Sequence, residues 1–140
     1  MNCTTVRFVD TNVLLYRLSR TTEEQEKRQI ADQIVSDQDL AFSTQVLQEF
    51  YVQATRTTRI DRVTHQQAVD LVMGLTRFPV QPTTLELVQA ALSSCERYQI
   101  SYWDAAIIEA ARSLGCTEVL SEDLNHGQNF GGVVVVNPFL

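Results

Sequence analysis

The chain has 140 residues, of which 44% are hydrophobic and 20% are charged, so it can bury one core and has the composition of a folded globular domain. Its formal net charge of −6 argues against nucleic-acid binding driven by bulk electrostatics, although it leaves local basic patches open. No apolar run approaches the roughly 20 residues of a membrane helix and no signal-peptide pattern begins the chain, so we expect a cytoplasmic protein without a membrane anchor.

The first predicted element is a short strand over 6–9, whose valines and phenylalanine suit a buried sheet position. A helix follows it directly, because apolar residues recur at helical spacing from Val13 to Leu18. Asp10 therefore stands at the carboxyl end of a strand, where parallel sheets bind their ligands. Taken alone, Asp10 is equally well explained as the cap of that helix.

The rest of the chain alternates between helices and short strands. The spacing of apolar residues predicts helices over 23–35, 46–54, 84–98 and 102–114, and a further helix that Thr64 can cap and whose apolar residues run from 68 to 75. Ser101 can cap the helix over 102–114. Strands are predicted over 40–42, 80–81, 118–121 and 133–136. Such alternation is typical of βαβ units and predicts a parallel sheet with helices on both faces. The helix-rich middle predicts a helical hairpin beside the sheet. Since no linker or repeat interrupts the pattern, we expect residues 1–140 to form a single domain.

The cysteines and histidines do not form a recognisable metal or disulfide pattern. Cys3, Cys95 and Cys116 are widely spaced and odd in number. Neither His65 nor His126 has a partner at metal-ligand spacing. The sequence therefore predicts reduced thiols, without a disulfide framework or a zinc site.

Four acidic residues are predicted to lie at one edge of the sheet. Asp10 and Asp123 come at or just after strand ends, while Glu49 and Asp104 lie in the first turns of helices that begin near that edge. Each acid also has a structural explanation, such as a capping box for Asp104 or a turn for Asp123. Crowded carboxylates repel one another unless a cation lies among them, and oxygen ligands favour Mg²⁺ or Mn²⁺. The pattern favours metal-dependent phosphodiester hydrolysis.

The segments that contain these acids resemble the four acidic motifs of PIN-domain ribonucleases, and most closely those of VapC-type toxins of prokaryotic toxin–antitoxin pairs. They are Phe8–Asn12, Ser43–Glu49, Tyr102–Ile107 and Leu120–Gln128. The resemblance spans nearly the whole chain in the right order, and it implies a three-layer α/β/α fold with a short-stranded central parallel sheet. It also implies Mg²⁺- or Mn²⁺-dependent cleavage of RNA, a homodimer, and inhibition by a cognate antitoxin.

The resemblance assigns roles by position. The quartet that holds the metal and activates water in the family is matched by Asp10, Glu49, Asp104 and Asp123. Its supporting polar residues, which orient carboxylates or bind water and phosphate, are matched by Thr11, Asn12, Thr44 and Ser121. Some members carry a further acid where this chain has Asn125 and His126, which leaves the occupancy of a second metal position open.

Arginine supplies nearly all the basic charge, and its planar group suits phosphate. We expect four arginines to line the RNA-binding groove despite the net acidity of the chain, namely Arg17, Arg20, Arg56 and Arg59. For the cluster that follows position 55, a solvated loop balanced by Asp61 is an equally simple explanation.

Two other functions stay open beside that of a ribonuclease toxin. A PIN-like module without catalytic activity could bind RNA or a protein partner, with the acids as structural remnants. An aspartate-nucleophile phosphatase would use Asp10, but it needs a second aspartate at position 12 and a well-placed lysine, whereas this chain has Asn12 and only Lys27. Nothing in the sequence identifies the RNA target, since selectivity resides in surface shape and loops.

Overall fold

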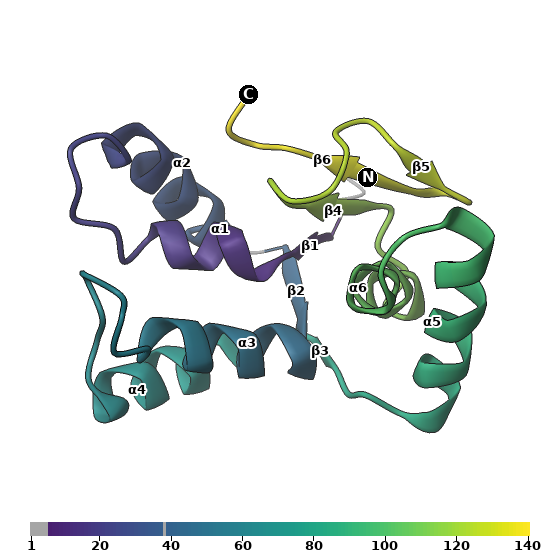
Figure 1. Ribbon diagram of the computed structural model, residues 1–140, viewed down its shortest axis with the longest axis horizontal. Coiled ribbons are helices and arrows are strands. Elements are labelled where there is room, and N and C mark those ends of the chain that lie inside the picture. Colours follow the sequence, from purple (N-terminus) through teal and green to yellow (C-terminus); the bar gives the residue numbers. More distant parts are fainter. Residues whose placement is uncertain (1–5, 38) are drawn as a thin grey trace.

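The computed structural model describes residues 6–37 and 39–140, so Cys3 lies outside the described part of the chain. Figure 1 shows a central sheet with α1 to α4 on one side and α5 and α6 on the other. The elements are β1 (Arg7–Val9), α1 (Thr11–Tyr16), α2 (Gln25–Val35), β2 (Leu40–Ser43), α3 (Thr44–Ala54), α4 (His65–Leu75), β3 (Val80–Gln81), α5 (Leu85–Tyr98), α6 (Tyr102–Ser113), β4 (Glu118–Leu120), β5 (Asn129–Phe130) and β6 (Val133–Val136). The expected α/β fold with helices on both faces of the sheet is confirmed.

The six strands lie in the order β3-β2-β1-β4-β6-β5. Every neighbouring pair is parallel except β5 with β6, in which Phe130 lies opposite Val133. Strand β5 was not predicted from the sequence, because two residues are too few to show an alternating pattern. Gly131 and Gly132 join the two strands with φ angles of +61° and +103°, a conformation that favours glycine. The sheet is therefore parallel with one antiparallel edge.

Aromatic and branched side chains from both faces of the sheet fill the core. Phe8, Phe42 and Phe130 are fully buried, and Phe42 meets Phe78 edge to face with ring centroids 5.6 Å apart. Helix α6 is buried along the whole stretch 105–111, in which small alanines recur. The predicted helical hairpin is also present, since α3 and α4 lie against each other (Figure 1).

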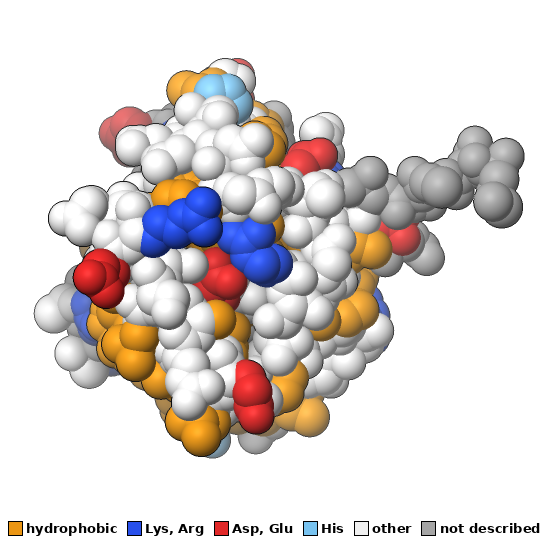
Figure 2. Space-filling model, turned by 90° about the vertical axis from the view of Figure 1, so that its right-hand side faces the viewer, with side chains coloured by type: hydrophobic (Ala, Val, Ile, Leu, Met, Phe, Trp, Pro, Cys, Tyr) orange, Lys and Arg blue, Asp and Glu red, His pale blue; other side chains and the backbone are white. Residues whose placement is uncertain are grey.

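A buried carboxylate joins α5, α6 and the β5–β6 hairpin. The Ser94 hydroxyl donates to Glu109 at 2.7 Å, and Arg112 Nε donates to it at 3.0 Å. Arg112 also donates to the carbonyls of Phe130 and Gly131, at 2.6 and 2.9 Å. Figure 2 shows the side of the molecule that carries α5, where basic and acidic side chains are interspersed in a largely uncharged surface. Because an unpaired buried charge is costly, loss of a partner of Glu109 would destabilise the fold.

The remaining expectations concern cysteines and membranes. Among the described residues, Cys95 and Cys116 are free cysteines, and Cys116 is buried. Across residues 6–37 and 39–140, every helix is too short or too polar to cross a membrane.

Candidate active site

Parallel pairing brings the carboxyl ends of β1, β2 and β4 to one edge of the sheet. Asp10 follows β1, Ser43 ends β2, and Ser121 follows β4. The Asp10 backbone N–H donates to the Leu120 carbonyl at 3.0 Å, which continues the pairing of β1 with β4 to the edge itself. The position of Asp10 is therefore fixed by backbone pairing as well as by its side chain.

Asp10 both caps α1 and carries a perturbed carboxyl group. Its side chain accepts hydrogen bonds from the Thr11 backbone N–H at 2.7 Å and from the Ser121 hydroxyl at 2.8 Å, and the residue is only 8% exposed. Burial raises the pKa of Asp10 from 3.8 to about 6, and the charges of Glu49 and Asp123 add to the rise, while the two hydrogen bonds oppose it. Asp10 is therefore a helix cap and also a candidate site residue, so the two explanations do not exclude each other.

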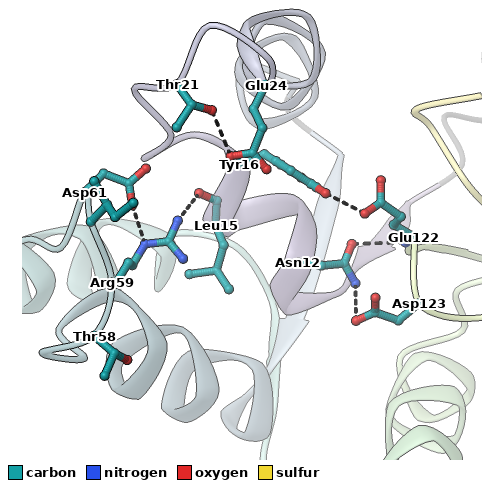
Figure 3. A pocket seen from close by; sticks show the side chains of 11 residues that line it. Asn12, Leu15, Tyr16, Thr21, Glu24, Thr58, Arg59, Asp61, Glu122 and Asp123 are labelled. Carbon is teal, nitrogen blue, oxygen red and sulfur yellow. Dashed lines mark hydrogen bonds and ion pairs between the residues drawn. The ribbon is translucent and has the colours of Figure 1, made fainter.

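Asn12 links two of the acids. Its Nδ2 lies 3.2 Å from Asp10 Oδ2 and 3.3 Å from Asp123 Oδ2, and its Oδ1 accepts the Glu122 backbone N–H at 3.0 Å. Figure 3 shows the Asn12 amide between Glu122 and Asp123. The Ser121 hydroxyl accepts the Asp123 backbone N–H at 3.1 Å. One amide and one hydroxyl therefore hold Asp10 and the loop of Asp123 together.

Glu49 lies in the second turn of α3 and not in the first as expected, because the helix begins at Thr44, and it is held from two directions. The Thr11 hydroxyl donates to Glu49 Oε2 at 2.9 Å, which connects Glu49 to the residue that follows Asp10. Gln45 Nε2 donates to Glu49 Oε1, also at 2.9 Å. The sequence analysis did not single out Gln45, although a residue four positions before an acid on a helix shares its face.

Asp104 lies in the first turn of α6, whose N-cap is Ser101. The Asp104 backbone N–H donates to the Ser101 hydroxyl at 3.1 Å, as the capping explanation predicts. Burial raises the pKa of Asp104, and the charges of Asp123 and Glu49 raise it further against the effect of Ser101. The charges of Glu49 and Asp123 therefore act on both Asp10 and Asp104.

The structure places the other predicted site residues less uniformly. The hydroxyl of Thr44 faces Thr83 at 3.0 Å instead of a carboxylate. Arg17 pairs with Asp32, and both Arg20 and Arg56 are exposed. These residues are not drawn into the carboxylate cluster.

Arg59 borders the cluster through a hollow of about 470 Å³, to which Asn12 and Asp123 also contribute (Figure 3). Its guanidinium donates to the Leu15 carbonyl at 3.2 Å. Its Nε lies 2.8 Å from Asp61 Oδ1, but this contact is an ion pair without hydrogen-bond geometry. Of the four predicted arginines, Arg59 thus shares a hollow with one acid of the quartet, Asp123.

Glu122 is engaged beside the cluster. It accepts hydrogen bonds from Lys27 and from the Tyr16 hydroxyl. Burial acts to raise the pKa of Glu122, but the hydrogen bonds from Lys27 and Tyr16 outweigh it and hold that pKa below its ordinary value. The only lysine of the chain is therefore committed to Glu122, a contact that the sequence analysis did not foresee.

The chemistry of the donor set fits a hard divalent cation. Four carboxylates offer oxygen ligands. Burial raises the pKa values of Asp10 and Asp104, and the charges of Glu49 and Asp123 add to the rise, so a cation among these groups would favour their ionised forms. Within the described ranges, no three His, Cys, Asp or Glu side chains are placed to hold one ion together. An ion would therefore have to draw the carboxylates closer than they lie here.

Comparison with known proteins identifies one sequence family. The profile described as PIN domain matches residues 7–128. No match was found among curated protein sequences.

Solved structures share the fold at low sequence identity. A toxin–antitoxin complex from Klebsiella pneumoniae is 20% identical, with a TM-score of 0.67 over 94% of this chain and 97% of that one. FitAcB from Neisseria gonorrhoeae is 16% identical, with a TM-score of 0.70 over 96% and 99%. VapC20 from Mycobacterium tuberculosis, a toxin that cleaves the sarcin–ricin loop, is 18% identical, with a TM-score of 0.63 over 84% and 91%. These likenesses concern the fold.

Proposed function

The chain belongs to the PIN-domain family, and on that premise we propose that it is a Mg²⁺- or Mn²⁺-dependent endoribonuclease and the toxin of a toxin–antitoxin pair. The observation that carries the proposal is that Asp10, Glu49, Asp104 and Asp123 lie near one edge of the sheet. There the charges of Glu49 and Asp123 add to the burial that raises the pKa values of Asp10 and Asp104. Toxins with the same fold, one of which cleaves the sarcin–ricin loop, support it.

The four carboxylates are the proposed metal ligands, and a bound Mg²⁺ or Mn²⁺ would supply Lewis-acid polarisation of the scissile phosphate and a more acidic water. The chain's own polar residues keep the carboxylates in place. Asn12 and Ser121 orient Asp10, and Thr11 orients Glu49. Such hydrogen bonds to ligating groups fix their direction and raise their affinity for a metal.

The first test is RNA cleavage by wild type, Asp10→Asn and Asp104→Asn with Mn²⁺ and with EDTA. We expect cleavage by wild type with Mn²⁺ alone and no cleavage by either variant. Asp70→Asn, on the exposed surface of α4, is the matched control and should cleave like wild type. Full activity of both site variants would refute the assignment of the site.

A second test measures metal binding without activity. A metal that binds only the native state at 100 times its dissociation constant stabilises that state by about 2.7 kcal/mol. We therefore expect Mn²⁺ to raise the unfolding free energy of the wild type and to have less effect on Asp10→Asn. Circular dichroism during urea unfolding measures the difference.

The proposal extends to the partners and the location of the protein. We propose a homodimer that a cognate antitoxin inhibits in the cytoplasm, with residues 1–140 as one domain. A hollow of about 500 Å³ between α3 and α4 is lined by apolar side chains, among them Val52 and Met73, and supports a protein contact on this face. Co-purification with the product of a neighbouring reading frame tests the antitoxin, and sedimentation tests the dimer.

Arg17, Arg20, Arg56 and Arg59 stay proposed phosphate contacts. Replacing these arginines by glutamate should weaken RNA cleavage and reduce its salt dependence. The variants would neutralise fewer phosphates, so fewer counterions would leave the RNA on binding. Arg59 should have the largest effect, since it shares a hollow with Asp123. Unchanged cleavage and salt dependence would remove these residues from the site.

One observation favours a second candidate, a non-catalytic PIN-like module that binds RNA or protein. In the part of the chain that the structure describes, the carboxylates are not close enough together to ligate one ion. If Mn²⁺ neither stabilised the protein nor supported cleavage of any RNA, this candidate would replace the nuclease. The phosphatase gains no support, because Lys27 is paired with Glu122.

A further inference from the structure

The chain has a single tryptophan, and it stands beside the carboxylate cluster. Trp103 immediately precedes Asp104 in the first turn of α6 and is 64% exposed. Single exposed apolar side chains are common on proteins, but an exposed indole next to a site presents an aromatic face to whatever binds there. Trp103 is neither a proposed metal ligand nor one of the residues that orient the ligands.

The position of Trp103 is fixed relative to Glu49. Gln45 Nε2 donates to Glu49 Oε1 at 2.9 Å and also to the Trp103 carbonyl at 3.3 Å, so one amide joins the acid to the backbone that carries the indole. The Tyr102 ring meets the indole edge to face, with centroids 5.1 Å apart at an angle of 83°. These contacts restrain Trp103 without covering it.

A hollow of about 340 Å³ lies beside the indole. It is lined by Trp103, Val52, Glu49 and three glutamines, Gln45, Gln48 and Gln53. Glutamine amides both donate and accept hydrogen bonds, which suits the edge of a nucleobase. The hollow thus combines an aromatic wall, amides and a carboxylate of the cluster.

We propose that Trp103 is a stacking platform for an unpaired base of the RNA substrate, next to the phosphate that is cleaved at the carboxylate cluster. This inference rests on the proposed function. Stacking on an aromatic side chain requires a base whose face is free, so the substrate is single-stranded RNA, or a loop, instead of a regular duplex. Stacking also provides affinity without basic charge, which suits a chain of net charge −6.

The test measures binding to the Asp10→Asn protein, so that RNA is not consumed. Since Trp103 is the only tryptophan, its fluorescence reports on this position alone. The probes are an oligoadenylate of about 8 nucleotides, within the span that single-strand binders cover, an abasic chain of the same length, and a duplex. We expect the oligoadenylate to quench the fluorescence and the abasic chain and the duplex to leave it nearly unchanged.

Variants made in the Asp10→Asn background, with labelled RNA followed by anisotropy, provide the second measurement. Trp103→Ala should weaken oligoadenylate binding about 10-fold and leave binding of the abasic chain as it was, because stacking of one base contributes energy of that order. Trp103→Phe should lose less, because it keeps a ring. Leu92→Ala, which removes an exposed apolar side chain from α5, is the matched control and should bind as the parent does.

Three outcomes would overturn the inference. Equal affinity of Trp103→Ala and its parent for oligoadenylate is the first, and equal quenching by the abasic chain is the second. The third is a change of sedimentation in Trp103→Ala without any effect of RNA on the parent's fluorescence, which would make Trp103 a contact between two copies. Failure of the proposed function looks different, because wild type would then cleave no RNA with Mn²⁺ even where base stacking at Trp103 is measured.

Discussion

Replacement of Asp10 by asparagine should abolish RNA cleavage. In the absence of metal, it should also reduce the loss of folding stability that the protein undergoes as the pH rises to neutral. Burial and the neighbouring acids raise the pKa of Asp10 from 3.8 to about 6 in the folded protein. A carboxyl group with a raised folded-state pKa contributes its full stability below about pH 4 and loses it as the pH rises through about 6. The corresponding loss is about 3 kcal/mol at pH 7. Asparagine carries no charge, so it escapes this loss.

The hydrogen bonds around Asp10 modify the absolute stability of the variant. The asparagine oxygen can still accept the Thr11 backbone N–H, but its amide meets the Asn12 amide, and two donors oppose each other there. This cost does not change with pH between 4 and 8. The prediction therefore concerns the pH dependence of the difference between the two proteins.

Urea unfolding in EDTA at several values from about pH 4.5 to about pH 7.5 measures that difference. The unfolding free energy of Asp10→Asn minus that of wild type should grow by about 2 kcal/mol across this range, since part of the loss has already occurred at pH 4.5. Asp70→Asn, with its side chain on exposed α4, should run parallel to wild type. The argument that burial and neighbouring acids destabilise ionised Asp10 would be refuted in two cases. In the first, the difference in unfolding free energy does not change with pH; in the second, wild type becomes more stable relative to the variant as the pH rises.

Three further substitutions test the packing and the hydrogen bonds around the site. Arg112→Met should cost about 2 kcal/mol in urea unfolding, because it leaves the buried Glu109 carboxylate without its cationic partner and with the Ser94 hydroxyl as donor, although the partial exposure of Arg112 limits the loss. Thr11→Val should keep the fold by circular dichroism but lower RNA cleavage about 10-fold, because Glu49 loses the hydroxyl that orients it; wild-type cleavage would show that this hydrogen bond does not matter. Phe42→Ala should cost about 3–5 kcal/mol by the same unfolding assay, since its ring is fully buried, and a cost below about 1 kcal/mol would contradict the packing described.

Helix caps and the first strand and helix could be predicted from the sequence, because each depends on residues only a few positions apart. The N-caps at Thr64 and Ser101 are present, the first as a full capping box. The strand that ends before Asp10 and the helix that follows it are also present. Such features need no knowledge of distant segments, because backbone hydrogen bonds and apolar periodicity are set within one or two turns.

Predictions about distant partners were incomplete for the opposite reason. Sequence separation hides that Lys27 pairs with Glu122 across 95 positions and that the Asn12 amide reaches Asp123 across 111. The antiparallel strand β5 was missed because its two residues gain their pattern only from pairing with β6. Thr44, expected beside the acids, faces Thr83 because the segment after β3 passes it.

The sequence by itself determined the alternation of strands and helices, and with it the expectation that four acids would share one edge of a parallel sheet. Only the tertiary structure decided how the acids are arranged at that edge. Hydrogen bonds from Asn12, Thr11 and Ser121 link them, and among the described residues no three carboxylates lie close enough together to bind one ion. The physical reason is that periodicity specifies which face or edge a residue occupies, whereas distances between side chains depend on strand order and packing across the whole sheet.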